Sequence, residues 1–144
     1  MESSTCFNLT YASHLARRVL LLGFALIVAV LLGIQASGIA LAATVEVKMT
    51  DTPPVYIPKQ VTIHVGDTVK WVNTAQTLHT VTFDPAKAVN KANVQLPAGV
   101  APFDSGFMMP GQDFSHTFTV PGEYKYFCIP HEKDGMIGFV TVKK

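Results

Sequence analysis

The stretch YFCIPHEKDGM at residues 126–136 carries the most informative chemistry of this 144-residue sequence. Cys128, His131 and Met136 bring a thiol, an imidazole and a thioether into one short segment. These ligand types suit copper, and two histidines, one cysteine and a weak axial methionine form a mononuclear site used for electron transfer. Pro130 and Gly135 suit a chain that bends sharply around a single ion. The stretch therefore predicts three of the four ligands of such a site.

A second histidine is needed to complete this ligand set, and His79 is the best candidate. It begins the stretch HTVTF at residues 79–83, whose alternating apolar side chains predict a strand. Cys128 ends another predicted strand, so pairing between neighbouring strands would bring the two side chains together. Each residue also has an ordinary interpretation: Cys128 as a small buried hydrophobe, Met136 as core packing and His79 as a hydrogen-bonded strand residue.

The surrounding sequence alternates with the period of two that is typical of half-buried strands. Residues 44–49 and 61–65 show this alternation most clearly. Further strand patterns cover residues 68–73, 114–120, 123–128 and 137–142, with turn signals at 65–67, 110–111 and 121–122. Residues 84–106 break the rhythm and predict a long irregular connection, in which residues 85–93 could form one short helix. About seven short strands in series predict an all-β sandwich or barrel.

Several of these features together resemble the plastocyanins and closely related members of the cupredoxin superfamily, which are small blue-copper proteins. The matching segments are GDTV leading into KWVN at 66–73, VTFD at 81–84, PG at 110–111, PGEY at 121–124 and the pattern C-x2-H-x4-M at 128–136 followed by Ile137 and Gly138. The resemblance covers residues 44–144. It implies a cupredoxin-like Greek-key β-sandwich of about seven to eight strands.

The same resemblance implies a role for each ligand of one copper ion. Cys128 and His131 become equatorial ligands, Met136 becomes the axial ligand, and His79 is the upstream histidine. The implied function is that of a one-electron carrier, which cycles between Cu(I) and Cu(II) and is not an enzyme.

The sequence departs from the plastocyanin pattern at positions that concern its partners. His79 lacks the preceding proline and the following asparagine that plastocyanins commonly have, so the match is to the superfamily before the subfamily. Phe127 stands where plastocyanins usually carry a docking tyrosine, and the sequence has no acidic run. We expect an apolar docking surface at the exposed edge of His131, near Ile129 and Pro130, with few charges to steer association. The expected partners are protein electron donors and acceptors in membrane-associated electron-transport complexes, and the chain is expected to be a monomer.

The N-terminal part of the sequence predicts export. Arg17 and Arg18 precede an uncharged apolar run at residues 19–34, which a polar break and the small-x-small sequence ending at Ala42 follow. This order is typical of a secretory signal peptide, so residues 1–42 are predicted to be removed.

An uncleaved membrane anchor formed by residues 19–43 is the alternative, because the apolar run lies between a signal-peptide length and a membrane-spanning length. In either case, the positive residues before the run place the single domain at residues 43–144 outside the cytoplasm. The expected location is a periplasm or a thylakoid lumen.

Charge and cysteine content exclude some classes of protein. After Ala42 the chain has nine lysines, nine acidic residues and no arginine, which argues against nucleic-acid binding because phosphates require a basic stripe. Cys128 is then the only cysteine, so the domain has no intramolecular disulfide. A lone thiol in an oxidising compartment is expected to be shielded, ligated or catalytic.

Rival functions fit the same residues less well. A thiol enzyme would use His131 as the base for Cys128, but the spacing offers no third group to orient that base. Copper delivery or storage in the periplasm remains the alternative, although the open tracts rich in Met and His that would mark it are absent. Zinc would recruit a fourth strong ligand in place of a thioether. The other candidate ligands are assigned to surface or packing roles; they are His64, His116, Met108 and Met109.

Overall fold

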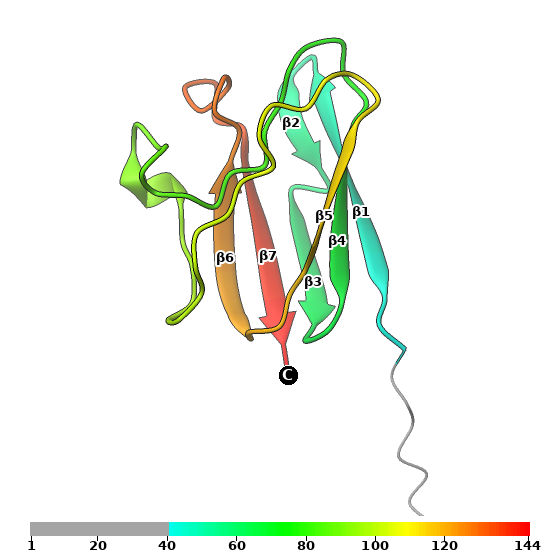
Figure 1. Ribbon diagram of the computed structural model, residues 1–144. Helices are drawn as coiled ribbons and strands as arrows, with labels where there is room; N and C mark the ends of the chain where they lie inside the picture. Colours follow the sequence, from blue (N-terminus) through cyan, green and yellow to red (C-terminus); the bar gives the residue numbers. More distant parts are fainter. Residues whose placement is uncertain (1–40) are drawn as a thin grey trace, which may run out of the picture. The chain divides into compact units, whose positions relative to one another are not determined.

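The computed structural model describes residues 41–144, which form two β-sheets packed face to face (Figure 1). Within this range lie seven strands and one short 3-10 helix: β1 (Thr44–Asp51), β2 (Pro54–Ile57), β3 (Gln60–His64), β4 (Thr68–Asn73), η1 (Lys91–Asn93), β5 (Asp113–Thr117), β6 (Gly122–Phe127) and β7 (Ile137–Lys143). None of the helical structure in this range is long and apolar enough to cross a membrane. The predicted export signal falls on residues 1–42 and so lies almost entirely outside the described residues.

The strands follow the order β2-β1-β4-β5 in one sheet and β3-β7-β6 in the other. Pairs β1–β4 and β3–β7 are parallel, and the remaining neighbours are antiparallel. Parallel neighbours cannot be joined by a tight hairpin, so the chain crosses between the sheets several times. The predicted cupredoxin-like Greek-key sandwich is confirmed, with almost no helix.

The inner faces of both sheets form one aromatic core, which also reaches the candidate site. Trp71 of β4 is fully buried, and its indole N–H donates to the Tyr126 hydroxyl of β6 at 2.9 Å. Tyr56 of β2 is buried as well and donates its hydroxyl to the Thr80 carbonyl at 2.6 Å. Burying a large side chain of this kind contributes about 1.5–3 kcal/mol. The core therefore fixes the backbone next to His79 as well as joining the two sheets.

The structure differs from the sequence prediction at residues 79–83, which form isolated bridges and not a regular strand. His79 pairs with Met108, and Thr82 pairs with Phe127 on the other side. Between them, the Thr80 N–H donates to the Cys128 sulfur and the Val81 N–H donates to the Ser105 hydroxyl. Side-chain acceptors thus replace backbone carbonyls, which interrupts the ladder. The predicted proximity of this segment to Cys128 is nevertheless correct.

Two smaller differences between the structure and the sequence predictions have local causes. Strand β2 was not expected from the sequence, because Pro54 begins it and Pro58 follows it. It lies at the edge of its sheet, where a missing N–H is tolerated. The helix predicted at 85–93 is reduced to the single turn η1, where the Asn90 side chain accepts the Ala92 N–H.

Candidate metal centre

Residues 128–136 form a tight loop between the paired strands β6 and β7. Cys128 directly follows β6 and Met136 directly precedes β7, so both ends of the loop are fixed by the β6–β7 ladder. The Cys128 N–H donates to the Met136 carbonyl at 3.1 Å, and the Met136 N–H donates to the His131 carbonyl at 3.1 Å. Gly135 has a φ of 78°, a left-handed conformation that favours glycine. We refer to residues 128–136 as the 128–136 loop.

Three of the four predicted ligands come together at the end of the sandwich where this loop lies. The Nδ1 atoms of His79 and His131 are each 3.5 Å from the Cys128 sulfur. One donor atom from each of these residues lies within 4.8 Å of the other two. Bonds from a first-row ion to nitrogen and sulfur are about 2.0–2.3 Å, so three donors around one ion lie about 3.5–4 Å apart. The two nitrogen–sulfur distances therefore match those expected around a single ion.

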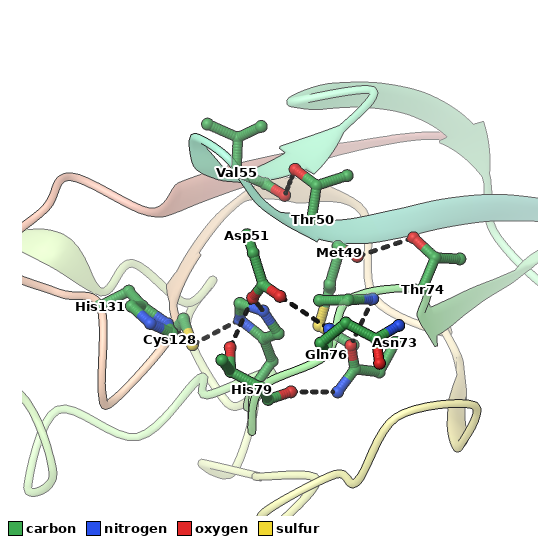
Figure 2. A network of polar contacts seen from close by, with 12 residues as sticks. Met49, Thr50, Asp51, Val55, Asn73, Thr74, Gln76, His79, Cys128 and His131 are labelled. Carbon is green, nitrogen blue, oxygen red and sulfur yellow. Dashed lines mark hydrogen bonds and ion pairs between the residues drawn. The ribbon is translucent and has the colours of Figure 1, made fainter.

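His79 is the most firmly held of the three residues (Figure 2). Its side chain is fully buried, and its Nε2 lies 3.1 Å from the carboxylate Oδ1 of Asp51. The Thr77 hydroxyl and the Gln76 N–H also donate to this carboxylate, and they lower the pKa of Asp51 to about 2. Burial lowers the pKa of His79, although the hydrogen bond to Asp51 opposes that effect. Burial of His79 thus favours the neutral imidazole, and its Nδ1 faces the thiol.

Cys128 is buried and unpaired, and its surroundings favour the neutral thiol when no cation is present. Burial raises the pKa of this thiol, against hydrogen bonds from Thr80 that lower it. The Thr80 N–H donates to the sulfur at 3.3 Å, and the Thr80 hydroxyl accepts the Ile129 N–H at 2.8 Å. A coordinating cation would deprotonate such a thiol. The donor set and its burial thus suit a soft metal ion that forms a thiolate bond.

The fourth predicted ligand, Met136, lies at the end of the 128–136 loop. Its side chain is fully buried in the same core cluster as Cys128. Its backbone closes the 128–136 loop through the hydrogen bonds described above. This position is compatible with an axial thioether, and the ligand role of Met136 stays a prediction.

Glu132 lies beside His131 in the sequence but turns inward, with an exposed fraction of 8%. Its carboxylate accepts the N–H groups of Val89 and Asn90 and the side-chain amide of Asn93, each at 2.9 Å. Burial raises the pKa of Glu132, but these hydrogen bonds outweigh it and lower the pKa below its ordinary value. Glu132 therefore ties the 128–136 loop to the long connection before β5.

His131 is the partly exposed member of the donor triangle. Its ring lies 4.7 Å from the His79 ring, and Pro130 beside it is exposed.

Three apolar side chains have a large exposed fraction, namely Leu78 at 41%, Phe107 at 63% and Met109 at 57%. They lie at the same end of the sandwich, because Leu78 precedes His79 and the other two flank Met108, whose backbone pairs with His79. Exposed apolar side chains therefore lie on the segments next to the donor triangle.

The remaining candidate ligands lie away from the triangle or serve the packing. His64 is on the exposed face of β3, and His116 stacks on Phe103 with ring centroids 3.8 Å apart. Met108 is buried in the core, whereas Met109 is exposed. The surface role of His64, the packing of His116 and the packing of Met108 match the sequence predictions, whereas the packing predicted for Met109 is wrong because its side chain is exposed.

Sequence reasoning missed three residues that position the donors: Asp51, Thr80 and Glu132. Asp51 precedes His79 by 28 positions, and no spacing pattern connects the two. The sequence pattern places Thr80 within a predicted strand and gives no sign of its contact with Cys128. The one available signal for Glu132 was its place between two candidate ligands, where a solvent-exposed charge was equally consistent with the pattern.

Comparison with known proteins agrees with this geometry. Residues 43–143 match the family of copper binding proteins described as the plastocyanin/azurin family. A plastocyanin from Prochlorothrix hollandica is 39% identical over 106 residues, which cover 72% of this chain and 76% of that protein. A plastocyanin from a Synechococcus strain is 36% identical over 141 residues, which cover 90% and 95% of the two chains.

Solved structures of cupredoxins show the same fold. A mutant amicyanin in the Cu(I) state is 30% identical, with a TM-score of 0.52 and coverage of 69% of this chain and 82% of that chain. The pseudoazurin of Methylobacterium extorquens is 26% identical, with a TM-score of 0.56 and coverage of 70% and 76%. The buried histidine–cysteine–histidine triangle lies within the matched residues. This chain therefore belongs to the plastocyanin/azurin family of copper-binding proteins, with copper as its cofactor.

Proposed function

We propose that this blue-copper electron carrier works outside the cytoplasm, taking one electron from a protein donor and passing it to a protein acceptor. The observation that carries the proposal is the donor triangle of His79, Cys128 and His131, buried on one side and partly open on the other. A thiolate and two imidazoles would hold copper and supply one-electron chemistry between Cu(I) and Cu(II).

The proposed ligand roles follow from this arrangement. Cys128 and the Nδ1 atoms of His79 and His131 are the equatorial ligands, and the buried Met136 is the axial ligand that tunes the reduction potential. Two strands and a core segment hold these residues, so little ligand movement is needed when the oxidation state changes. The chain acts as a carrier and not as an enzyme, because burial and a raised pKa keep Cys128 from serving as a free nucleophile.

We assign residues 1–42 to an export signal, and residues 43–144 to the single mature domain. The contacts of Ala43 support cleavage after Ala42: the Ala43 nitrogen lies 2.7 Å from Oδ1 of Asp67, which is 8% exposed. Cleavage would turn this nitrogen into an ammonium group beside a carboxylate, and Leu41 and Ala42, the described residues before it, are exposed. Mass spectrometry of the exported protein tests this, and a retained N-terminal segment would mean that residues 19–43 tether the domain to a membrane.

The proposed docking surface is the apolar end around His131, formed by Leu78, Phe107, Met109 and Pro130. An electron that leaves through the His131 ring has the shortest path to solvent among the three equatorial ligands, because His79 and Cys128 are fully buried. The partners proposed for this surface are redox proteins of membrane-associated electron-transport complexes, which a monomer would approach through an apolar contact.

A visible absorption spectrum tests the function. The exported protein is loaded with Cu(II), its spectrum is recorded, and ascorbate is added. An intense band that bleaches on reduction and returns on oxidation is expected, because a copper–thiolate bond produces such a band. A protein that binds Cu(I) tightly but stays colourless with Cu(II) would contradict electron transfer and favour copper delivery or storage.

A further inference from the structure

The outer nitrogens of the two histidines have different surroundings. Both rings direct Nδ1 towards the Cys128 sulfur, so Nε2 is the atom that faces away from the donor triangle. In His79, Nε2 lies 3.1 Å from Oδ1 of Asp51. Within the described residues, the hydrogen bonds of the partly exposed His131 ring involve Nδ1 only. Asp51 therefore acts on one of the two histidines (Figure 2).

The chemistry of the Asp51 contact selects one tautomer of His79. An ionised carboxylate can only accept hydrogen bonds, so Nε2 must carry the proton. The lone pair then lies on Nδ1, which is the atom that faces Cys128. The ring is thus set in the form that can bind a metal ion before any ion arrives.

Asp51 is itself held in place, so its carboxylate cannot turn away easily. It ends β1, and it pairs with Pro54 of β2. The Gln76 N–H donates to Oδ2 at 2.7 Å, and the Thr77 hydroxyl donates to Oδ1. These donors come from the turn that leads into His79, so the carboxylate joins the end of β1 to that turn.

We propose that Asp51 is a positioning residue that fixes the tautomer of His79 and strengthens it as a ligand for Cu(II) relative to Cu(I). Partners of this kind orient the imidazole and raise its basicity, and their loss typically costs 10–100-fold in metal affinity. The negative charge favours the ion of higher charge. The inference rests on the ligand assignment made under Proposed function, and it adds a residue outside the four ligands that sets the potential.

A purely structural role for Asp51 is the competing explanation, because its carboxylate also holds the turn at residues 76–77. The variant Thr77→Val separates the two roles. It removes the Thr77 donor to Oδ1, whereas the carboxylate keeps its charge and the Gln76 N–H that holds Oδ2. A second control, Glu46→Gln, removes an exposed carboxylate from the other half of the same strand.

The test compares the wild type with Asp51→Asn, Thr77→Val and Glu46→Gln by two readouts. The first is the nitrogen NMR spectrum of the imidazoles in the copper-free and Cu(I) proteins, which reports whether Nε2 or Nδ1 of His79 carries the proton. The second is the reduction potential of the copper-loaded protein. In Asp51→Asn, a tenfold loss of Cu(II) affinity with unchanged Cu(I) affinity would raise the potential by about 59 mV.

The proposal predicts a proton on Nε2 of His79 in the wild type and a reduction potential that rises in Asp51→Asn. Both controls should keep a reduction potential close to that of the wild type. A proton on Nδ1 in the wild type would overturn it even if Asp51→Asn does not fold. An equal rise in Thr77→Val would also overturn it, because the turn and not the charge would then set the potential. Failure of the ligand assignment is distinguishable, because the wild type would then lack the visible band.

Discussion

His79 and His131 reach the same sulfur from two segments that are built differently. The segment of His79 is buried from residue 79 to residue 83, and its side chains and backbone bind to β1, to β6 and to the Ser105 region. The 128–136 loop is half exposed, and it is held by its own backbone hydrogen bonds and by Glu132. One side of the site is thus part of the core, whereas the other is part of the surface.

This difference separates two tasks that an electron carrier must combine. The buried segment keeps the distance and direction of His79 and Cys128 constant, which limits rearrangement when the charge of the ion changes. The exposed segment lets His131 meet a partner protein. Thr80 connects the two, because it donates to the Cys128 sulfur and accepts from Ile129.

Removal of the shared sulfur should have the largest effect. Cys128→Ser replaces the thiol with a hydroxyl that cannot form the copper–thiolate bond, so the intense visible band should disappear. Absorption spectra of the wild type and the variant at equal copper loading measure this. A variant that stays blue would show that Cys128 is not a ligand.

Substitution of Met136, the proposed axial ligand, should change the reduction potential without loss of copper. Met136→Gln exchanges a weak thioether for an oxygen donor, which favours Cu(II) and should lower the reduction potential while copper stays bound. Voltammetry of the variant and the wild type tests the direction, and an unchanged potential would mean that Met136 is not an axial ligand. Met108→Gln is unsuitable as a control because Met108 is also buried, so the exposed Met109→Gln serves instead.

Substitution of Glu132 tests whether the 128–136 loop depends on the hydrogen bonds of the Glu132 carboxylate. Glu132→Ala leaves the N–H groups of Val89 and Asn90 without their acceptor, which should cost about 1–3 kcal/mol in the free energy of unfolding. Denaturant unfolding of the copper-free protein measures this loss. Asp134→Ala, at an exposed position of the same loop, should change it little. If Glu132→Ala also changed the tautomer of His79, the two segments would not be independent.

The smallest effect is expected for substitution of Asp67, which lies at the end of the sandwich that the site does not occupy. The His64 and Ala43 N–H groups lower the pKa of Asp67 below its ordinary value of 3.8. Its contribution to stability is therefore complete above that value and is lost as the pH falls through the lowered pKa. Asp67→Asn should be less stable than the wild type at neutral pH, and the difference should disappear in acid. The reduction potential should not change, and a shift would show that this end is coupled to the site.

The sequence predicted the parts of the molecule that depend on local pattern. Strand patterns located β1, β3, β4, β5, β6 and β7, and the spacing of Cys128, His131 and Met136 located the 128–136 loop. His79 could be selected because few histidines precede a strand-like segment.

The unpredicted parts depend on contacts between distant segments. Asp51 meets His79 only because β1 and β4 pair in parallel with a particular register, and the sequence does not specify that register. Residues 79–83 alternate as a strand does, but the acceptors of two of their N–H groups are the side chains of Cys128 and Ser105. Neither partner can be inferred from a local pattern.

Crystal structures of the copper-loaded protein before and after reduction would test the central claim most directly. They are predicted to show one ion bonded to the Cys128 sulfur and to Nδ1 of both histidines, with His79 and Asp51 in the same positions in the two oxidation states. An ion bound elsewhere, or a His79 ring that leaves Asp51 on reduction, would contradict the view that the buried segment fixes the site.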